Sequence, residues 1–294
     1  MKITSIVFSR NDGFKDDKRC IAHFLACLET FDEIIYVDWN SDEEKGSLLW
    51  KLEDRLPKTG KIKHIVIPPS VVSQLVTNPD AFAVNETLTR NIGIRRAEGD
   101  WIVNTNIDII PPSRADLESF ISKSNKDTFY TISRREAPLD IFDKYKAEEW
   151  RKFYKELCDK IPERRFPAKV SPNDSYSLIN CCGDFQLAHR DIWNSIRGYE
   201  EGMNKFCFID TNVQKKAILN GFALEAAYNP PLFHIEHGAY KITADGEKEK
   251  ADKWNEGAKV NKYNNVYKWV EDFRTSENQE DWGLSNTDIE YEIF

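Results

Sequence analysis

Residues 88–108 read LTRNIGIRRAEGDWIVNTNID. Residues 86–97 have helical spacing with Asn85 as a plausible cap, and Gly99 interrupts that pattern. The apolar run Trp101-Ile102-Val103 then predicts a buried strand. This strand leads directly into the polar stretch 104–108, which ends in Asn106-Ile107-Asp108. A helix followed by a buried strand with a polar end is typical of α/β proteins.

The rest of the first half repeats this alternation. Strand-like runs at residues 3–8, 34–37 and 62–67 are separated by stretches with helical spacing. Two further runs end in polar clusters, at residues 9–12 and 38–42. Because ligands bind beyond the carboxyl ends of strands in an open parallel sheet, three such clusters indicate a ligand site. Ordinary polar loops and caps are the alternative for each cluster taken singly.

The second half has a mixed pattern. An apolar stripe predicts a helix over residues 150–161, and further helices are expected near 190–197 and from Asp210 to Gly221. Residues 162–176 are rich in proline and loop-like. We expect one domain over residues 1–238, made of a first half (1–110) and a second half (111–238). Residues 239–294 are expected to form a peripheral C-terminal extension.

Composition limits the partners and the compartment. The 294 residues are 40% hydrophobic and 31% charged, and the formal net charge is -8. An acidic chain lacks the basic surface that coats nucleic acid, so no nucleic-acid partner is expected. No apolar run has the length of a membrane span and no export signal is evident, although peripheral membrane association stays open. The six cysteines form no C-x-x-C pair, which favours reduced thiols in the cytoplasm.

Two acidic positions and one amide are candidates for chemistry. Asn106 and Asp108 stand two positions apart in an extended segment, so both can face one side and offer oxygen ligands to a divalent metal. Asp210 begins a predicted helix and is suited to act as a general base. A solvated turn is the alternative for the tripeptide, and helix capping is the alternative for Asp210.

Other polar side chains have weaker signals. Asp38 follows the second strand and suits either a nucleoside contact or a cap. His234 and His237 are competent metal ligands, or structural residues at a strand end. Arg90, Arg95 and Arg96 suit phosphate binding, or an ordinary solvated helix face.

The order of these motifs resembles GT-A glycosyltransferases similar to family two. Residues 88–102 resemble the family's A-R-N-x-G…A-x-G-x-[YF]-I run, which leads into a D-x-D motif. Val37-Asp38-Trp39-Asn40-Ser41 corresponds to V-D-D-G-S, and Arg197-Gly198-Tyr199-Glu200-Glu201 resembles the G-G-[FY]-D-E turn. Ile209-Asp210 matches the E-D motif, and residues 234–238 are similar to a terminal histidine motif. Three motif acids differ, because Trp39, Asn106 and Ile209 stand in their places.

The resemblance implies an open, mostly parallel twisted α/β sheet flanked by helices, with a nucleotide-sugar-binding half (1–110) and a mixed α+β acceptor-binding half (111–238). It also implies roles for particular residues. Asp210 is the base, Asp184 and Gln186 face the acceptor, and the metal ligands are Asp108, Asn106 and His237. The expected nucleotide-sugar contacts are Ser9, Arg10, Asn11, Asp12, Asp38, Asn40, Arg90, Asn91, Arg95 and Asn106.

The leading hypothesis is a hexosyltransferase-like enzyme that uses Mn²⁺ or Mg²⁺. It would transfer a sugar from a nucleoside-diphosphate donor, UDP-linked by expectation, to a hydroxyl of a glycan or glycoconjugate, with inversion. A binding-only relative is the second hypothesis, motivated by the acids missing at Asn106 and Ile209. A sugar nucleotidyltransferase is the third, although the loop after the first strand has few glycines. The sugar, the linkage and the oligomeric state are not predicted.

Overall fold

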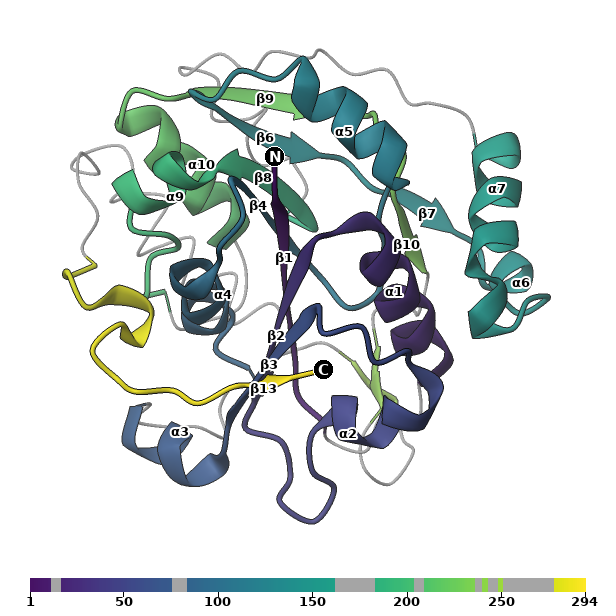
Figure 1. The fold of residues 1–294 in the computed structure, drawn as a ribbon, viewed down its shortest axis with the longest axis horizontal. Helices are drawn as coiled ribbons and strands as arrows, with labels where there is room; N and C mark the ends of the chain where they lie inside the picture. Colours follow the sequence, from purple (N-terminus) through teal and green to yellow (C-terminus); the bar gives the residue numbers. More distant parts are fainter. Residues whose placement is uncertain are drawn as a thin grey trace.

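The computed structural model describes residues 1–11, 17–75, 84–161, 183–203, 209–235 and 278–294, and the backbone of 240–242 and 248–250. Strands and helices alternate through the first half, as the periodicity predicts (Figure 1). The strands are β1 (Ile3–Ser9), β2 (Glu33–Trp39), β3 (Ile62–Ile67), β4 (Trp101–Thr105), β5 (Ile109–Ile110), β6 (Thr128–Ile132), β7 (Arg135–Ala137), β8 (Phe185–His189), β9 (Ala223–Ala227), β10 (Phe233–Ile235), β11 (Tyr240–Ile242), β12 (Lys248–Lys250) and β13 (Glu292–Ile293). The α-helices are α1 (Asp17–Thr30), α2 (Leu48–Leu52), α3 (Pro69–Leu75), α4 (Glu86–Arg96), α5 (Arg114–Ser122), α6 (Leu139–Phe142), α7 (Trp150–Lys160), α9 (Arg190–Ser195) and α10 (Ile209–Leu219). Short 3-10 helices cover Glu53–Arg55, Ala147–Glu149 and Trp282–Leu284.

Eight strands form the main sheet, in the order β13-β3-β2-β1-β4-β8-β6-β9. β3, β2, β1 and β4 are parallel neighbours, so their carboxyl ends meet at one edge. β8 runs antiparallel to both β4 and β6, and β9 runs parallel to β6. The predicted open, mostly parallel α/β sheet is therefore confirmed, with the mixed strand directions confined to the second half and the β13 edge.

Side chains alternate between the two faces of this sheet. On β1, Ile3 and Val7 belong to one apolar cluster and Ile6 belongs to the other. α1, α5 and α7 cover the first face, and α4, α9 and α10 cover the second. Because strand side chains point alternately to opposite faces, each central strand fills two cores. This burial on both faces explains why these strands read as continuous apolar runs.

β2 is longer than its apolar run. The strand continues through Asp38 and Trp39, which pair with Val66 and Ile67 of β3. Both side chains are buried, and Trp39 packs in the core on the α4 face. The polar cluster thus begins with a buried carboxyl inside the strand, and not with a solvated turn.

A small second sheet, in the order β5-β10-β7, stands next to the carboxyl end of β4. β10 pairs antiparallel with β5 and parallel with β7, which brings His234 level with Ile109 and Glu136. β5 follows β4 after three residues, so the loop 106–108 lies between the two sheets. Segments from three parts of the sequence therefore meet at Asp108.

Residues 278–294 pack against the first half of the chain. The yellow segment in Figure 1 passes α4 and ends as β13, which pairs antiparallel with β3. Trp282 is buried in the core on the α4 face, and Arg96 donates hydrogen bonds to the carbonyls of Gly283 and Leu284. The division at residues 238 and 239 stays a prediction, but this part of the expected extension is integrated with the sheet.

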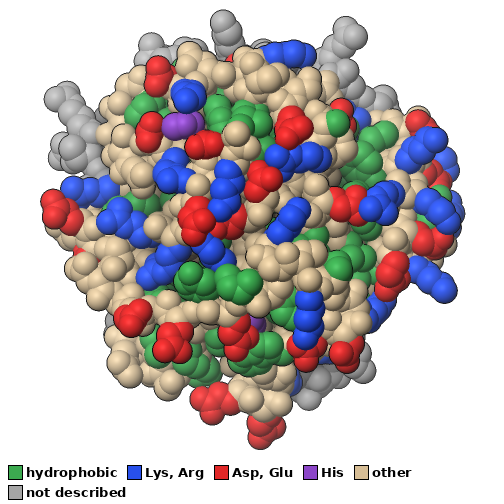
Figure 2. Space-filling view, viewed as in Figure 1, with side chains coloured by type: hydrophobic (Ala, Val, Ile, Leu, Met, Phe, Trp, Pro, Cys, Tyr) green, Lys and Arg blue, Asp and Glu red, His purple; other side chains and the backbone are tan. Residues whose placement is uncertain are grey.

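In the part of the chain that the structure describes, no helix is both long enough and apolar enough to cross a membrane. Among the described residues, Cys20, Cys27 and Cys158 form no disulfide bond with one another. On the face shown in Figure 2, acidic and basic side chains are interspersed among the described residues.

Candidate active site

Asn106 joins two oppositely charged side chains at the end of β4. Its Oδ1 accepts a hydrogen bond of 2.7 Å from Nη2 of Arg90, and its Nδ2 donates one of 2.6 Å to Oδ1 of Asp184. The other oxygen of Asp184 accepts a bond of 2.5 Å from Nη1 of Arg134. Arg90 extends from α4, and Asp184 immediately precedes β8. A continuous chain of hydrogen bonds, from Arg90 through Asn106 and Asp184 to Arg134, therefore crosses the carboxyl end of the sheet.

Arg90 is buried with unusually little hydrogen bonding. The side chain is 4% exposed, and its guanidinium lies over the rings of Phe8 and Tyr199. Within the described residues, its Nε and Nη1 atoms have no hydrogen-bond partner. A buried cation with unused donors is costly unless a ligand satisfies them. Arg90 is therefore suited to bind an anionic group.

Asp108 faces a histidine from the second sheet. Nε2 of His234 lies 3.3 Å from Oδ2 of Asp108, and Nδ1 of His234 lies 2.6 Å from Oε2 of Glu136. Burial alone would lower the pKa of His234, but the hydrogen bonds that its ring donates to Asp108 and Glu136 outweigh burial and raise the pKa to about 9. Hydrogen bonding to His234 likewise outweighs burial at Glu136, whose pKa falls to about 2.

This donor set fits a divalent metal in part. A carboxylate and a neutral imidazole are good ligands, so a metal would displace the proton on Nε2 of His234. A second carboxylate on the far ring nitrogen is the usual support for a metal-binding histidine. The amide oxygen of Asn106 accepts from Arg90, and His237 lies outside the described residues. Across the described part of the chain, no group of three or more His, Cys, Asp or Glu residues forms a ready metal site.

Asp210 lies in the first turn of α10 and packs against a glycine. A β-carbon on Gly183 would come within 2.3 Å of the β-carbon of Asp210, so only glycine permits this approach. Burial raises the pKa of Asp210, and the nearby Asp184 adds to the effect. The backbone N–H of Thr211 donates to the carboxylate at 2.9 Å and opposes that rise. A desolvated carboxylate with a raised pKa is suited to accept a proton.

Gln186 holds the backbone beneath Asp210. Its Nε2 donates to the carbonyl of Asp210 at 3.1 Å, and its Oε1 accepts from the hydroxyl of Tyr199. Gln186 is fully buried. Both polar atoms of its amide are thus bonded within the protein.

The predicted nucleoside contacts gather around Asp38. Oδ1 of Asp38 accepts from the hydroxyl of Ser41 at 2.7 Å and from Tyr36 at 3.4 Å, and Tyr36 also bonds Ser9. Burial raises the pKa of Asp38 to about 6. The backbone N–H of Asn11 donates to the same Ser41 hydroxyl.

Three further predicted nucleotide-sugar contacts, Asn40, Arg10 and Asp12, are near Asp38 or Ser9 in the sequence. Asn40 is buried with a positive φ of 56°, and its backbone N–H bonds the carbonyl of Ile67. Arg10 is half-buried beside this group, and Asp12 lies outside the described residues.

Two other predicted contacts lie apart from these groups. Asn91 is buried, with its amide bonded to the backbone of Tyr199 and to Glu201. Arg95 is exposed on the far end of α4, with its guanidinium 5.0 Å from the ring of Trp282. Asn91 thereby fixes the turn at residues 198–201 against α4.

Sequence reasoning did not single out Glu86, Arg134 or Glu136. Glu86 lies in the first turn of α4, where burial raises its pKa while Arg90 opposes the rise. Arg134 and Glu136 belong to the short β7 region, which has no helical or strand period. Charged residues in so short a segment give no local signal of their role.

No protein-family model matches the sequence. A search of curated proteins also finds no match. Among solved structures, the chain is similar to GalNAc-T7 crystallised with UDP, GalNAc and Mn²⁺. The TM-score is 0.56 at 12% identity, over 97% of this chain and 56% of that one. The chain has the nucleotide-diphospho-sugar transferase fold.

Weaker likenesses to this GT-A fold include TarS 1–349 of S. aureus. Its TM-score is 0.49 at 15% identity, over 80% of this chain and 60% of that one. A nucleotidyl transferase from Methanothermobacter thermautotroptrophicus has a TM-score of 0.44 at 14% identity, over 77% of this chain and 87% of that one. The chain thus spans less than two thirds of the length of TarS 1–349 and of GalNAc-T7.

Proposed function

We propose that this chain transfers a sugar from a nucleoside-diphosphate donor to a hydroxyl group of a glycan or glycoconjugate. The observation that carries the proposal is the meeting of Asp210, Arg90 and the Asp108–His234 pair at one edge of a GT-A sheet. A raised-pKa carboxylate, a buried cation and a metal-type donor pair are the groups that such a transfer needs.

Asp210 acts as the general base. Its carboxylate takes the proton of the acceptor hydroxyl, whose oxygen forms a bond to the anomeric carbon of the donor sugar. The bond between that carbon and the phosphate oxygen breaks, and the nucleoside diphosphate leaves with the electron pair. A single displacement of this kind inverts the anomeric carbon. The raised pKa of Asp210 supports the assignment.

Asp108 and His234 would hold a divalent metal, with Glu136 orienting the imidazole. His234 takes the place that was expected for His237, because Nε2 of His234 already faces Asp108. A divalent metal bound there would neutralise charge on the leaving diphosphate. The carboxylate and imidazole pair favours Mn²⁺ over Mg²⁺, and the Mn²⁺ and UDP in the GalNAc-T7 structure support the same choice.

Arg90 and Arg134 bind the donor diphosphate. Arg90 offers unused donors from a buried position, while the side chain of Arg134 is 31% exposed and reaches Asp184. Cationic side chains next to a phosphate stabilise the charge that accumulates on it. Asp38 and Ser9 contact the nucleoside at the carboxyl ends of β1 and β2, where the two residues are register partners.

The decisive experiment is a thermal-shift screen of UDP-, GDP- and CMP-sugars with and without Mn²⁺, followed by transfer assays on the stabilising donor. We expect stabilisation that requires both nucleotide and metal, and loss of transfer in Asp210→Asn with donor binding retained. Asp140→Asn, an exposed residue on α6, is the matched control. Full transfer by Asp210→Asn would contradict the base assignment. Donor binding without transfer by the unchanged chain would favour a binding-only protein.

A further inference from the structure

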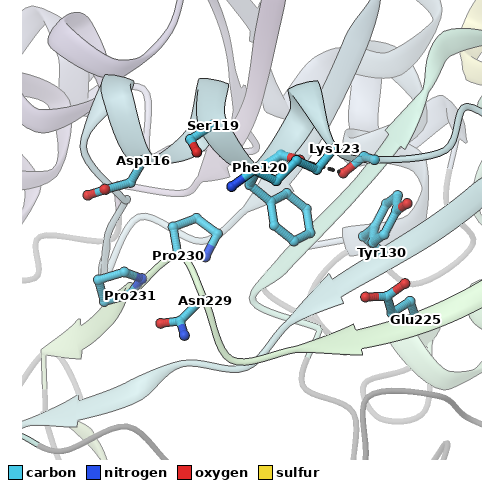
Figure 3. Close-up of a pocket in the computed structure, with 10 residues that line it drawn as sticks. Asp116, Ser119, Phe120, Lys123, Tyr130, Glu225, Asn229, Pro230 and Pro231 are labelled. Carbon is cyan, nitrogen blue, oxygen red and sulfur yellow. Dashed lines mark hydrogen bonds between the residues drawn. The ribbon is translucent and has the colours of Figure 1, made fainter.

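A pocket of about 440 Å³ lies between α5 and the outer strands β6 and β9. Figure 3 shows the ring of Phe120 between Tyr130 and the turn that carries Pro230. Tyr130 and Phe120 meet edge to face at 5.2 Å, with Tyr130 buried and Phe120 half-buried. The volume is in the usual range for small-molecule sites, which spans roughly 300–1,000 Å³.

The pocket is separate from the candidate active site. Tyr130 of β6 belongs to the core on the α5 face of the sheet. The next residue, Thr131, pairs with Gln186, whose amide holds Asp210. Because neighbouring side chains on a strand point to opposite faces, the pocket and Asp210 stand on opposite sides of β6.

Glu225 supplies a carboxylate to the pocket wall. It is the register partner of Tyr130 across β6 and β9, so both side chains face α5 (Figure 3). Glu225 is half-buried, and no hydrogen bond or ion pair engages its side chain within the described residues. A partly desolvated carboxylate without a partner is a ready acceptor for hydroxyl or N–H donors.

The balance of charge around the pocket selects among ligands. Its charged lining residues are Asp116, Glu225 and Lys123, two acidic and one basic. A net negative lining disfavours phosphates, nucleotides and carboxylates. The apolar part of the lining comes from two aromatic rings and two proline rings, which offer flat surfaces. A neutral sugar matches both features, because its C–H face packs on a flat apolar surface while its edge hydroxyls donate to carboxylates.

We propose that this pocket binds a neutral saccharide unit, one belonging to the acceptor glycan at a distance from the transfer site. The assignment of the sugar to the acceptor rests on the proposed glycosyltransferase function. Phe120 and Pro230 contact the sugar ring, and Glu225 accepts hydrogen bonds from its hydroxyls. Such a site would hold one part of a glycan chain while the reacting end of that chain receives a sugar beside Asp210.

The test measures saccharide binding in the absence of nucleotide and metal. Glucose, galactose and N-acetylglucosamine, each as the free sugar and as a β-linked trisaccharide, are titrated by saturation-transfer NMR. We expect binding of at least one probe to the unchanged chain. Glu225→Gln is expected to weaken it about tenfold, by removing the charge from the accepting group.

Ser119→Trp provides an independent variant, because Ser119 is an exposed residue of α5 that lines the pocket. The indole should occlude the pocket and abolish binding without removing any core packing. Ser122→Trp, on an exposed position of the same helix that does not line the pocket, should bind as the unchanged chain does. Absence of binding by every probe, or binding that survives Ser119→Trp, would overturn the proposal. Failure of the donor and metal screen would instead count against the proposed function alone.

Discussion

His234 on β10 faces Asp108 in the loop that joins the main sheet to the β5-β10-β7 sheet, with 3.3 Å between Nε2 of His234 and Oδ2 of Asp108. Glu136 holds the other ring nitrogen of His234 at 2.6 Å. The three residues lie on different segments, and the pairing of β10 with β5 and β7 brings them together. A histidine fixed between two carboxylates has its ring orientation determined before any ligand arrives, which favours metal binding.

Glu136→Gln should therefore weaken Mn²⁺ binding by roughly 10–100-fold, the usual loss for a partner that orients a metal ligand. The amide keeps the shape of the side chain but cannot stabilise His234 as the carboxylate does. Isothermal titration with Mn²⁺ in the presence of UDP measures the change. Glu118→Gln, an exposed residue of α5, is the matched control. Equal Mn²⁺ affinity in both variants would show that Glu136 does not contribute to the metal site.

Asn106→Asp should lower activity, although it restores the acid of the D-x-D motif. The amide accepts from Arg90 and donates to Asp184, and a carboxylate cannot donate. Two carboxylates 2.6 Å apart would repel, so the loop 106–108 should shift. We expect at least about a tenfold loss of transfer and a lower melting temperature.

Asn125→Asp changes an exposed turn residue in the same way and should leave stability within about 0.5 kcal/mol. Increased transfer by Asn106→Asp would show that the amide is a defect and not a structural link.

Gly183→Ala should reduce transfer far more than it reduces stability. The new methyl group would meet the side chain of Asp210 at 2.3 Å and push the start of α10 away. Gly60→Ala is the comparison, because its φ of +72° causes backbone strain with only Ile293 nearby, at 4.0 Å. Assays of kcat and urea unfolding of both variants separate the two effects. Unchanged kcat in Gly183→Ala would exclude Asp210 as the base.

The stability of the Asp38→Asn variant, relative to that of the unchanged chain, should increase as pH rises. Burial raises the pKa of Asp38 from 3.8 to about 6. Between these pH values the folded protein binds a proton that the unfolded chain does not, so ionisation of Asp38 costs stability as pH rises through 6. The variant lacks this cost. Its free energy of unfolding relative to the unchanged chain should rise by roughly 2–3 kcal/mol from below pH 3.8 to above pH 6. Urea unfolding across that interval would contradict the assignment if the difference stayed constant.

Trp282→Ala should cost about 3–5 kcal/mol of stability, as expected for a large buried aromatic side chain. The residue is 3% exposed, and the ring packs in the core with α4. Trp50→Ala is the control, because that ring is 43% exposed and its loss should cost less. Urea unfolding measures both. Equal losses in the two variants would show that residues 278–294 add little to the core.

The sequence predicts the sheet well because buried parallel strands have a strong local signature. β1, β3, β4 and α4 agree with the expected segments, and Asn85 caps α4 through a bond from the N–H of Leu88. The order of the motifs also predicts that Asp108 and Asp210 lie in one region of the fold. Local patterns cannot show pairings between distant short strands, such as β7 with β10 or β13 with β3. The double hydrogen bond of Asn106 depends on Arg90 and Asp184 arriving from different elements, so it has no signature in the tripeptide itself.

The pairing of β13 with β3 also has a consequence for self-association. β3 is the outermost of the four parallel strands, and Ile62 and Ile65 are fully buried on it. A long strand of this kind with a bare edge would offer unsatisfied N–H and C=O groups to the edge of another molecule. β13 occupies part of that edge for only two residues and carries the charged, exposed Glu292. Residues 292 and 293 thus protect the molecule from adding further strands, and their loss should first appear as aggregation during expression.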